Sequence, residues 1–311
     1  MTLDHENRAL VESARQRATK PRHEMTPDEA RAVLEGLGEL LPAGADVARR
    51  ELFSVPVDSG EIELRLLVPH GELVGAMVYF HGGGWVIGSN DQFEPMCREI
   101  AVKTGIAIAM VCYRKAPEHP FPIPLEDAWI GYRWMRKNAE RLLGATLPLF
   151  VGGDSAGANL AAAVALRQKE TDPCAIAGQL LVYPVMDADF DRPSYTDPEN
   201  QTMLTREVMI GYWDHYIPDT SKRQSPDAAP LLAPDLSSLP PAVIVTAEHD
   251  VLRDEGEAYA ERLQAAGVPV THRRFDGQIH AFMMMLGLLP RAGAAIDFAS
   301  NAIRNLAAKA V

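Results

Sequence analysis

The chain has 311 residues, and its 42 Asp and Glu against 30 Lys and Arg give a formal net charge of −12. An acidic surface repels phosphate groups and no long basic run occurs, so neither nucleic acid nor an anionic membrane is expected as a partner. Hydrophobic residues make up 47% and charged residues 23%, which is the composition of an ordinary globular protein with a large core.

Targeting and redox signals are weak. No apolar run approaches the roughly 18 residues needed to cross a bilayer, and residues 1–8 are charged rather than apolar as in a secretory leader. We therefore expect a cytoplasmic protein. Cys97, Cys112 and Cys174 are odd in number and widely spaced, so we expect neither a disulfide framework nor a metal site, and no cofactor.

The first predicted elements are helical. Residues 1–45 predict one or two polar helices, with Thr26-Pro-Asp-Glu29 as a helix start before the helical period of 30–41. Apolar and polar residues then alternate over 62–68, which predicts a half-buried strand in an antiparallel hairpin with 52–57.

After the hairpin the pattern changes to short apolar runs, as expected for strands covered on both faces. These runs are 74–80, 106–112, 147–151, 176–182, 243–247 and 270–275. Segments of helical period separate them, among them 156–169, 253–266 and 290–310. The alternation predicts an α/β fold with a mainly parallel central sheet flanked by helices, forming a single domain over residues 1–311.

Residues 186–235 interrupt the alternation. This long insertion is rich in Asp, Pro and Tyr, and it has one helical segment near 206–216. Insertions of this length in compact folds are usually lids or binding elements.

The first chemical motif is Gly153-Asp154-Ser155-Ala156-Gly157, between a predicted strand and a predicted helix. Its glycines permit a sharp turn that lifts the serine hydroxyl above the sheet. By itself the pentapeptide is weak, because chance supplies it in about one chain in ten of this length. Its place between strand and helix makes it more specific.

The second motif is His81-Gly82-Gly83-Gly84, directly after the 74–80 strand. With 9 His and 23 Gly in 311 residues, such a run is expected by chance only about 0.004 times. Glycine backbone can direct N–H groups toward an oxygen that becomes negative during acyl transfer. The motif therefore indicates an oxyanion-binding loop, which His81 steadies by hydrogen bonding.

A serine nucleophile needs an acid and a histidine, which follow it in that order in this type of fold. Glu248, Asp250 and Asp254 follow the 243–247 strand. We prefer Asp250, because Asp254 falls in the first turn of the next helix, where the helix dipole explains an acidic residue. Glu248 stays a minor candidate.

Two histidines remain after the acid, His272 and His280. His272 lies inside the 270–275 strand and points to one face of the sheet, whereas His280 follows that strand in a loop. We therefore prefer His280 as the base. Asp154, beside the serine, is equally consistent with support of the site and with support of the local turn.

These motifs combine in a way that resembles one known family. Together with Tyr113-Arg-Lys-Ala-Pro-Glu-His-Pro-Phe-Pro122, they resemble the bacterial hormone-sensitive-lipase-like esterases from about residue 50 to the C-terminus. The resemblance implies an α/β-hydrolase fold with Ser155 as nucleophile, His280 as base and Asp250 as the acid that orients it.

The resemblance also implies an oxyanion hole made by the backbone N–H groups of Gly83, Gly84 and Ala156. It implies a helical cap formed by residues 1–45 and 186–235. The sequence departs from the family pattern twice, with Val251 in place of proline and Ala281 in place of glycine. The second change puts a methyl group beside the base, where it would crowd the pocket or shift the histidine loop.

The substrate implied by the resemblance is a small-molecule ester with a short to medium acyl chain. Five residues in or near the site loops are candidates for its pocket, although ordinary packing would explain each equally well: Trp85, Tyr183, Met203, Leu204 and Phe282. Two alternatives stay open, an amidase or arylformamidase on the same fold and a non-catalytic small-ligand receptor. Family members often pair through a sheet edge, so a homodimer is also a candidate assembly.

Overall fold

The computed structural model describes residues 3–310, and within them eight strands form one sheet in the order β1-β2-β4-β3-β5-β6-β7-β8. The strands are β1 (Arg49–Val57), β2 (Gly60–Val68), β3 (Gly75–Phe80), β4 (Ile106–Cys112), β5 (Leu149–Asp154), β6 (Gly178–Val182), β7 (Ala242–His249) and β8 (Val270–Ile279). The β1–β2 and β2–β4 pairs are antiparallel, and all the others are parallel. The predicted α/β class and the early hairpin are confirmed.

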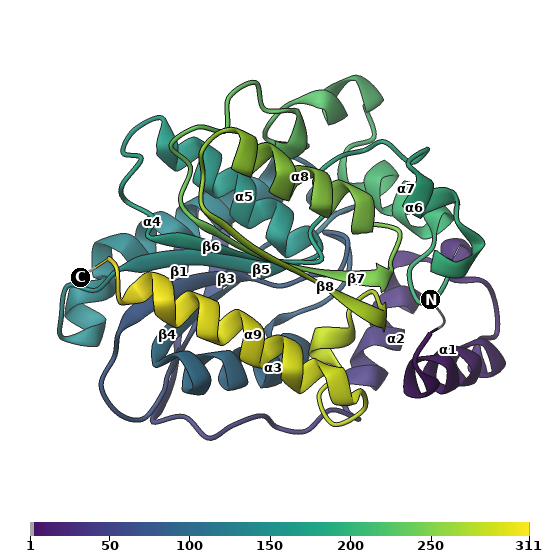
Figure 1. Cartoon of the computed structure of the whole chain (residues 1–311), viewed down its shortest axis with the longest axis horizontal. Coiled ribbons are helices and arrows are strands. Elements are labelled where there is room, and N and C mark those ends of the chain that lie inside the picture. The colour runs from purple at the N-terminus through teal and green to yellow at the C-terminus, as the bar shows by residue number, and fades with distance from the viewer. Residues whose placement is uncertain (1–2, 311) are drawn as a thin grey trace.

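Helices surround this sheet, and some of them cover its two faces (Figure 1). They are α1 (His5–Arg17), α2 (Pro27–Gly38), α3 (Asn90–Thr104), α4 (Ile123–Leu143), α5 (Ala156–Lys169), α6 (Pro193–Thr196), α7 (Arg206–Tyr216), α8 (Arg253–Ala265) and α9 (Pro290–Ala307). Figure 1 shows α4, α5 and α8 on one face and α3 and α9 on the other. No helix among the described residues is both long enough and apolar enough to cross a bilayer.

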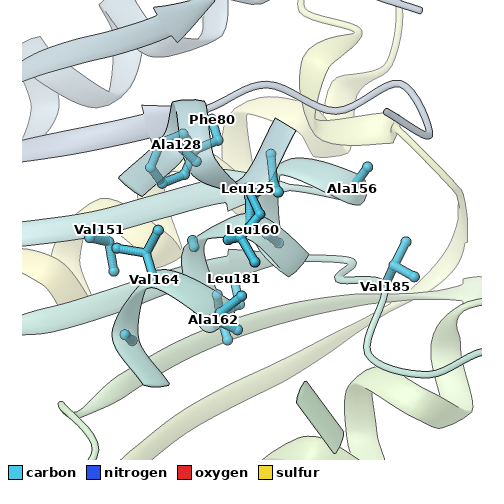
Figure 2. Packing of buried hydrophobic residues seen from close by; sticks show 14 of the residues in the cluster. Phe80, Leu125, Ala128, Val151, Ala156, Leu160, Ala162, Val164, Leu181 and Val185 are labelled. Atoms are coloured by element: carbon cyan, nitrogen blue, oxygen red, sulfur yellow. The ribbon is translucent and has the colours of Figure 1, made fainter. Parts of the chain in front are cut away.

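The core beneath the central helix explains its composition. Every residue of α5 from Ala156 to Ala165 is buried, and the many alanines let the helix approach the sheet closely. Its Leu160 and Val164 pack with strand residues such as Val151 and Leu181 (Figure 2). A helix buried nearly all round in this way is a rigid support for whatever stands at its N-terminus.

The N-terminal segment and the insertion gather at one end of the sheet. In Figure 1, α1, α2, α6 and α7 lie beyond the arrowheads of β7 and β8, which mark the carboxyl ends of these strands. The predicted start of α2 is confirmed, because Thr26 and Glu29 form a reciprocal capping box. The side chain of Asn7 in α1 donates to the carbonyl of Gly277 in β8 at 3.0 Å, which fastens the segment to the sheet.

Candidate active site

Ser155 stands at a tight turn between β5 and α5. Its backbone has φ 54° and ψ −121°, a conformation that is costly for a residue with a side chain. The turn requires the neighbouring glycines, because a Cβ at Gly157 would lie 1.9 Å from the Phe80 carbonyl oxygen and one at Gly153 would lie 2.3 Å from Gly157. The strained turn presents the serine hydroxyl at the carboxyl edge of the sheet.

Three side chains from distant parts of the chain meet here. His280 Nε2 lies 3.1 Å from Ser155 Oγ, and His280 Nδ1 lies 2.8 Å from Asp250 Oδ2. The relative exposures of Ser155, His280 and Asp250 are 5%, 8% and 1%. A carboxylate can only accept, so the Nδ1–H donates to Asp250 and leaves Nε2 free to take a proton from the serine.

The rejected candidates lie elsewhere. His272 Nε2 is 2.9 Å from Thr246 Oγ1 within the sheet. Asp254 is in the first turn of α8, where it accepts from the Ser194 amide at 2.8 Å. Glu248 accepts from the Gly277 amide at 2.7 Å. The geometry therefore brings together the three residues that sequence reasoning preferred.

The glycine loop after β3 leaves amide groups available next to the serine. Gly83 and Gly84 have φ of 114° and 58°, which non-glycine residues rarely adopt. Within residues 3–310, the backbone N–H groups of Gly83 and Gly84 donate to no other group, and Ala156 is the first residue of α5, where the helix offers no acceptor. These donors can bind an oxygen that gains negative charge.

Two buried polar residues hold this loop. His81 Nδ1 donates to the Gly82 carbonyl at 2.7 Å, with its ring stacked 4.5 Å from that of Tyr113, and burial lowers the His81 pKa to about 3, so it is neutral. Asp154 Oδ1 accepts from the Gly82 amide and the Tyr79 hydroxyl, each at 3.0 Å. Asp154 thus contacts the glycine loop, which favours support of the site over support of the local turn alone.

A cavity opens above the serine. It encloses about 640 Å³ of space free of atoms, part of which is open solvent. Ser155, His280, Gly83 and Gly84 lie at its base, and α2, α7 and the 281–285 segment supply most of the remaining wall. The walls are largely apolar, as is typical of sites for small organic ligands.

Only two of the five predicted pocket residues line this cavity. Met203 and Leu204 do so. Trp85 does not, because its indole is fully buried and stacked 4.2 Å from the ring of Tyr216. Tyr183 and Phe282 also do not, since both are buried behind the histidine loop with their ring centroids 6.1 Å apart.

Several wall residues were missed by sequence reasoning. They are apolar side chains of the N-terminal helix, the insertion helix and the methionine run: Leu34, Leu37, Met209, Tyr212, Met284 and Met285. The amphipathic period of 30–41 and the helical pattern of 206–216 were signals for these helices, but neither indicated which face meets the site. Ala281 has φ 65° and also lines the cavity, so the methyl group in place of glycine faces the site while His280 stays in hydrogen-bonding range of Ser155.

Known proteins match both the sequence and the fold. A family model described as alpha/beta hydrolase fold matches residues 77–284. Carboxylesterase NlhH of Mycobacterium tuberculosis is 39% identical over 222 residues, which cover 70% of this chain and 70% of that protein. Ethyl acetate hydrolase of Pseudomonas putida is 33% identical over 291 residues, or 91% of this chain and 92% of that protein.

Solved structures agree over almost the whole length. A thermostable esterase from Pseudomonas putida superposes with a TM-score of 0.89 at 33% identity, covering 98% of this chain and 97% of that chain. An ester hydrolase from the Lake Arreo metagenome, in complex with a bipyridine phosphonate derivative, superposes with a TM-score of 0.91 at 33% identity, covering 99% of each chain.

Proposed function

The chain belongs to the α/β-hydrolase family, in its hormone-sensitive-lipase-like branch of bacterial esterases, and from this premise we propose a serine carboxylesterase that acts on short- to medium-chain acyl esters. The similarity to esterases shows that the chain is a carboxylic ester hydrolase. The observation that supports the serine mechanism is the continuous hydrogen-bonded series from Asp250 through His280 to Ser155.

In the proposed acylation step, Ser155 Oγ attacks the ester carbonyl carbon while His280 Nε2 takes the hydroxyl proton. Asp250 holds the Nδ1–H and stabilises the imidazolium that forms. The imidazolium then gives its proton to the departing alcohol, which leaves an acyl group on Ser155. Water then gives a proton to His280 Nε2 and attacks the acyl carbon. As the bond from the acyl carbon to Ser155 Oγ breaks, the imidazolium returns that proton to Oγ and the carboxylic acid leaves.

The oxyanion of each tetrahedral intermediate is stabilised by the N–H groups of Gly83, Gly84 and Ala156. Donors fixed in place before reaction need no reorganisation as charge develops, and losing one typically costs about 2.7–4 kcal/mol of transition-state stabilisation. The burial of His81 and Asp154 around Gly82 supports this assignment, because it fixes the loop that presents two of the donors.

We also propose that residues 1–45 and 186–235 act as a cap over the reacting groups. Support comes from the cavity wall, to which α2 contributes Leu34 and Leu37 and α7 contributes Met209 and Tyr212. Such a cover excludes water and limits the size of the ester that reaches Ser155.

The decisive test is Ser155→Ala assayed on p-nitrophenyl butyrate. We expect kcat to fall by more than about a thousandfold with folding unchanged, because the nucleophile is removed. His272→Gln is the matched control and should keep its activity, since His272 pairs with Thr246 inside the sheet. A Ser155→Ala protein that keeps about a tenth of the wild-type rate would contradict the proposal.

Substrate class is tested by pairing each ester with its anilide and by an acyl-length series. We expect the ester to react much faster than the anilide, and butyrate and hexanoate to exceed chains beyond about ten carbons, because the cavity is small and covered. Faster anilide cleavage would indicate an amidase. A rate that rises through palmitate at an oil interface would indicate a true lipase.

A further inference from the structure

A second cavity lies against the proposed ester site. It encloses about 590 Å³ of space free of atoms, again with part open to solvent. Its lining is largely apolar and comes from η1 (Arg22–Glu24), α2, α7 and the loop after the glycine motif. Four residues line both cavities: Arg22, Leu34, Ile87 and Tyr212. The two spaces are therefore neighbours, and these four side chains form a wall common to both.

Tyr212 is the largest side chain in this shared wall, and its ring lies directly on the glycine loop. A Cβ added at Gly84 would lie 2.2 Å from Tyr212 Cδ2 and 2.4 Å from Cγ. The ring thus occupies the space that a side chain at position 84 would fill, between the proposed oxyanion donors and the second cavity.

The helix that carries Tyr212 is anchored independently of that ring. Trp213, the next residue, meets Trp85 edge-on with ring centroids 5.0 Å apart. One turn beyond Tyr212, Tyr216 stacks on the same indole with ring centroids 4.2 Å apart. All three of these aromatic side chains are fully buried. Truncating Tyr212 would therefore remove part of the wall without releasing α7.

We propose that Tyr212 is the specificity-determining partition between the two cavities and sets the upper length of the ester chain that the site accepts. The inference rests on the proposed esterase function and concerns the same site. With the ring present, a chain that extends from the reacting carbonyl meets the wall formed with Leu34 and Ile87. With the ring absent, the apolar second cavity takes the additional methylene groups of a longer acyl or alkyl chain.

The test compares wild type, Tyr212→Ala and Tyr212→Phe on two series, p-nitrophenyl esters of increasing acyl length and acetates of increasing alcohol length. In one of the series, Tyr212→Ala should raise the kcat/KM of a ten-carbon chain relative to a four-carbon chain about tenfold or more. Tyr212→Phe keeps the ring and should keep the wild-type profile.

Gly211 offers a matched second-site variant. It lines only the second cavity, and a Cβ added there meets no atom within 4 Å. Gly211→Leu alone should leave the wild-type length profile unchanged, because the partition already closes that space. In the Tyr212→Ala background, it should reverse the gain on long chains by filling the cavity again.

Three results would overturn the inference: an unchanged length profile in Tyr212→Ala, a uniform loss at all lengths, or a gain that Gly211→Leu does not reverse. Its failure is distinguishable from failure of the esterase proposal. Adding Ser155→Ala to Tyr212→Ala must abolish hydrolysis of every chain length. If it does while the profile stays unchanged, only the partition is refuted; if hydrolysis persists, the serine mechanism is refuted.

Discussion

Replacement of Asp154 by asparagine tests the cost of keeping a carboxyl group beside Ser155. Asp154 is 2% exposed, and burial raises its pKa to about 7 despite the hydrogen bonds from Tyr79 and Gly82. In the unfolded chain an aspartate has a pKa of about 3.9. Asparagine keeps an oxygen that can accept both hydrogen bonds but cannot ionise.

The sign of the pH effect follows from proton binding. Between about pH 4 and pH 7 the native state holds a proton on Asp154 that the unfolded chain has lost, so the free energy of unfolding falls as pH rises and levels off above pH 7. Each pH unit in this window corresponds to about 1.4 kcal/mol. From pH 5 to pH 7, wild type should therefore lose about 2.3 kcal/mol through this group, because the native carboxyl is half ionised at pH 7, and Asp154→Asn should not.

Urea unfolding of both proteins at pH 5, 6, 7 and 8 measures the difference directly. His81, whose pKa is lowered by burial, contributes stability that grows as pH rises to about 6.5, but it does so in both proteins and cancels in the comparison. The gain of Asp154→Asn over wild type should grow from pH 5 to pH 7 and level off by about pH 8. Parallel stability curves across this range would refute the raised pKa of Asp154 in the folded protein.

Two further substitutions test the glycine loop and the N-terminal helix. Gly84→Ala should lower kcat on p-nitrophenyl butyrate about a hundredfold. The added methyl group collides with Tyr212 and a φ of 58° disfavours alanine, so the loop must shift and move a proposed oxyanion donor. An unchanged kcat would show that the Gly84 amide does not have that role. Thr26→Ala should lower the free energy of unfolding by about 1 kcal/mol, because the capping box with Glu29 is lost. Urea denaturation measures this change, and an unshifted midpoint would show that the cap adds no net stability.

Most of the α/β fold of this protein could be predicted from its sequence. The structure gives α5 and β4 the bounds that their apolar patterns predict, because both are buried elements with clear punctuation on either side. The sequence also predicted that Ser155, Asp250 and His280 lie together. Parallel strands end at one edge of the sheet, so residues that follow different strands can meet there, and the expected chain order left few candidates. Their catalytic roles remain a prediction.

The cavity wall was much less accessible to sequence reasoning. Trp85 follows the glycine motif directly, but its indole turns into the core against Tyr216, whereas Tyr212 on the same helix faces the site. Helical periodicity distinguishes an apolar face from a polar one, but the face of α7 with Tyr212 and the face with Tyr216 are both apolar. β8 also continues to Ile279, past the predicted end at 275. The prediction ended too early because residues 276–278 carry no strand pattern.

The cavity is built from two kinds of chain segment that can be mutated separately. Its floor lies at the strand ends and the Ser155 turn, whereas α2, α7 and the 281–285 segment, none of which is part of the sheet, form the sides. Mutations in those outer segments can therefore change the shape of the cavity while the hydrogen-bonded series from Asp250 through His280 to Ser155 stays intact.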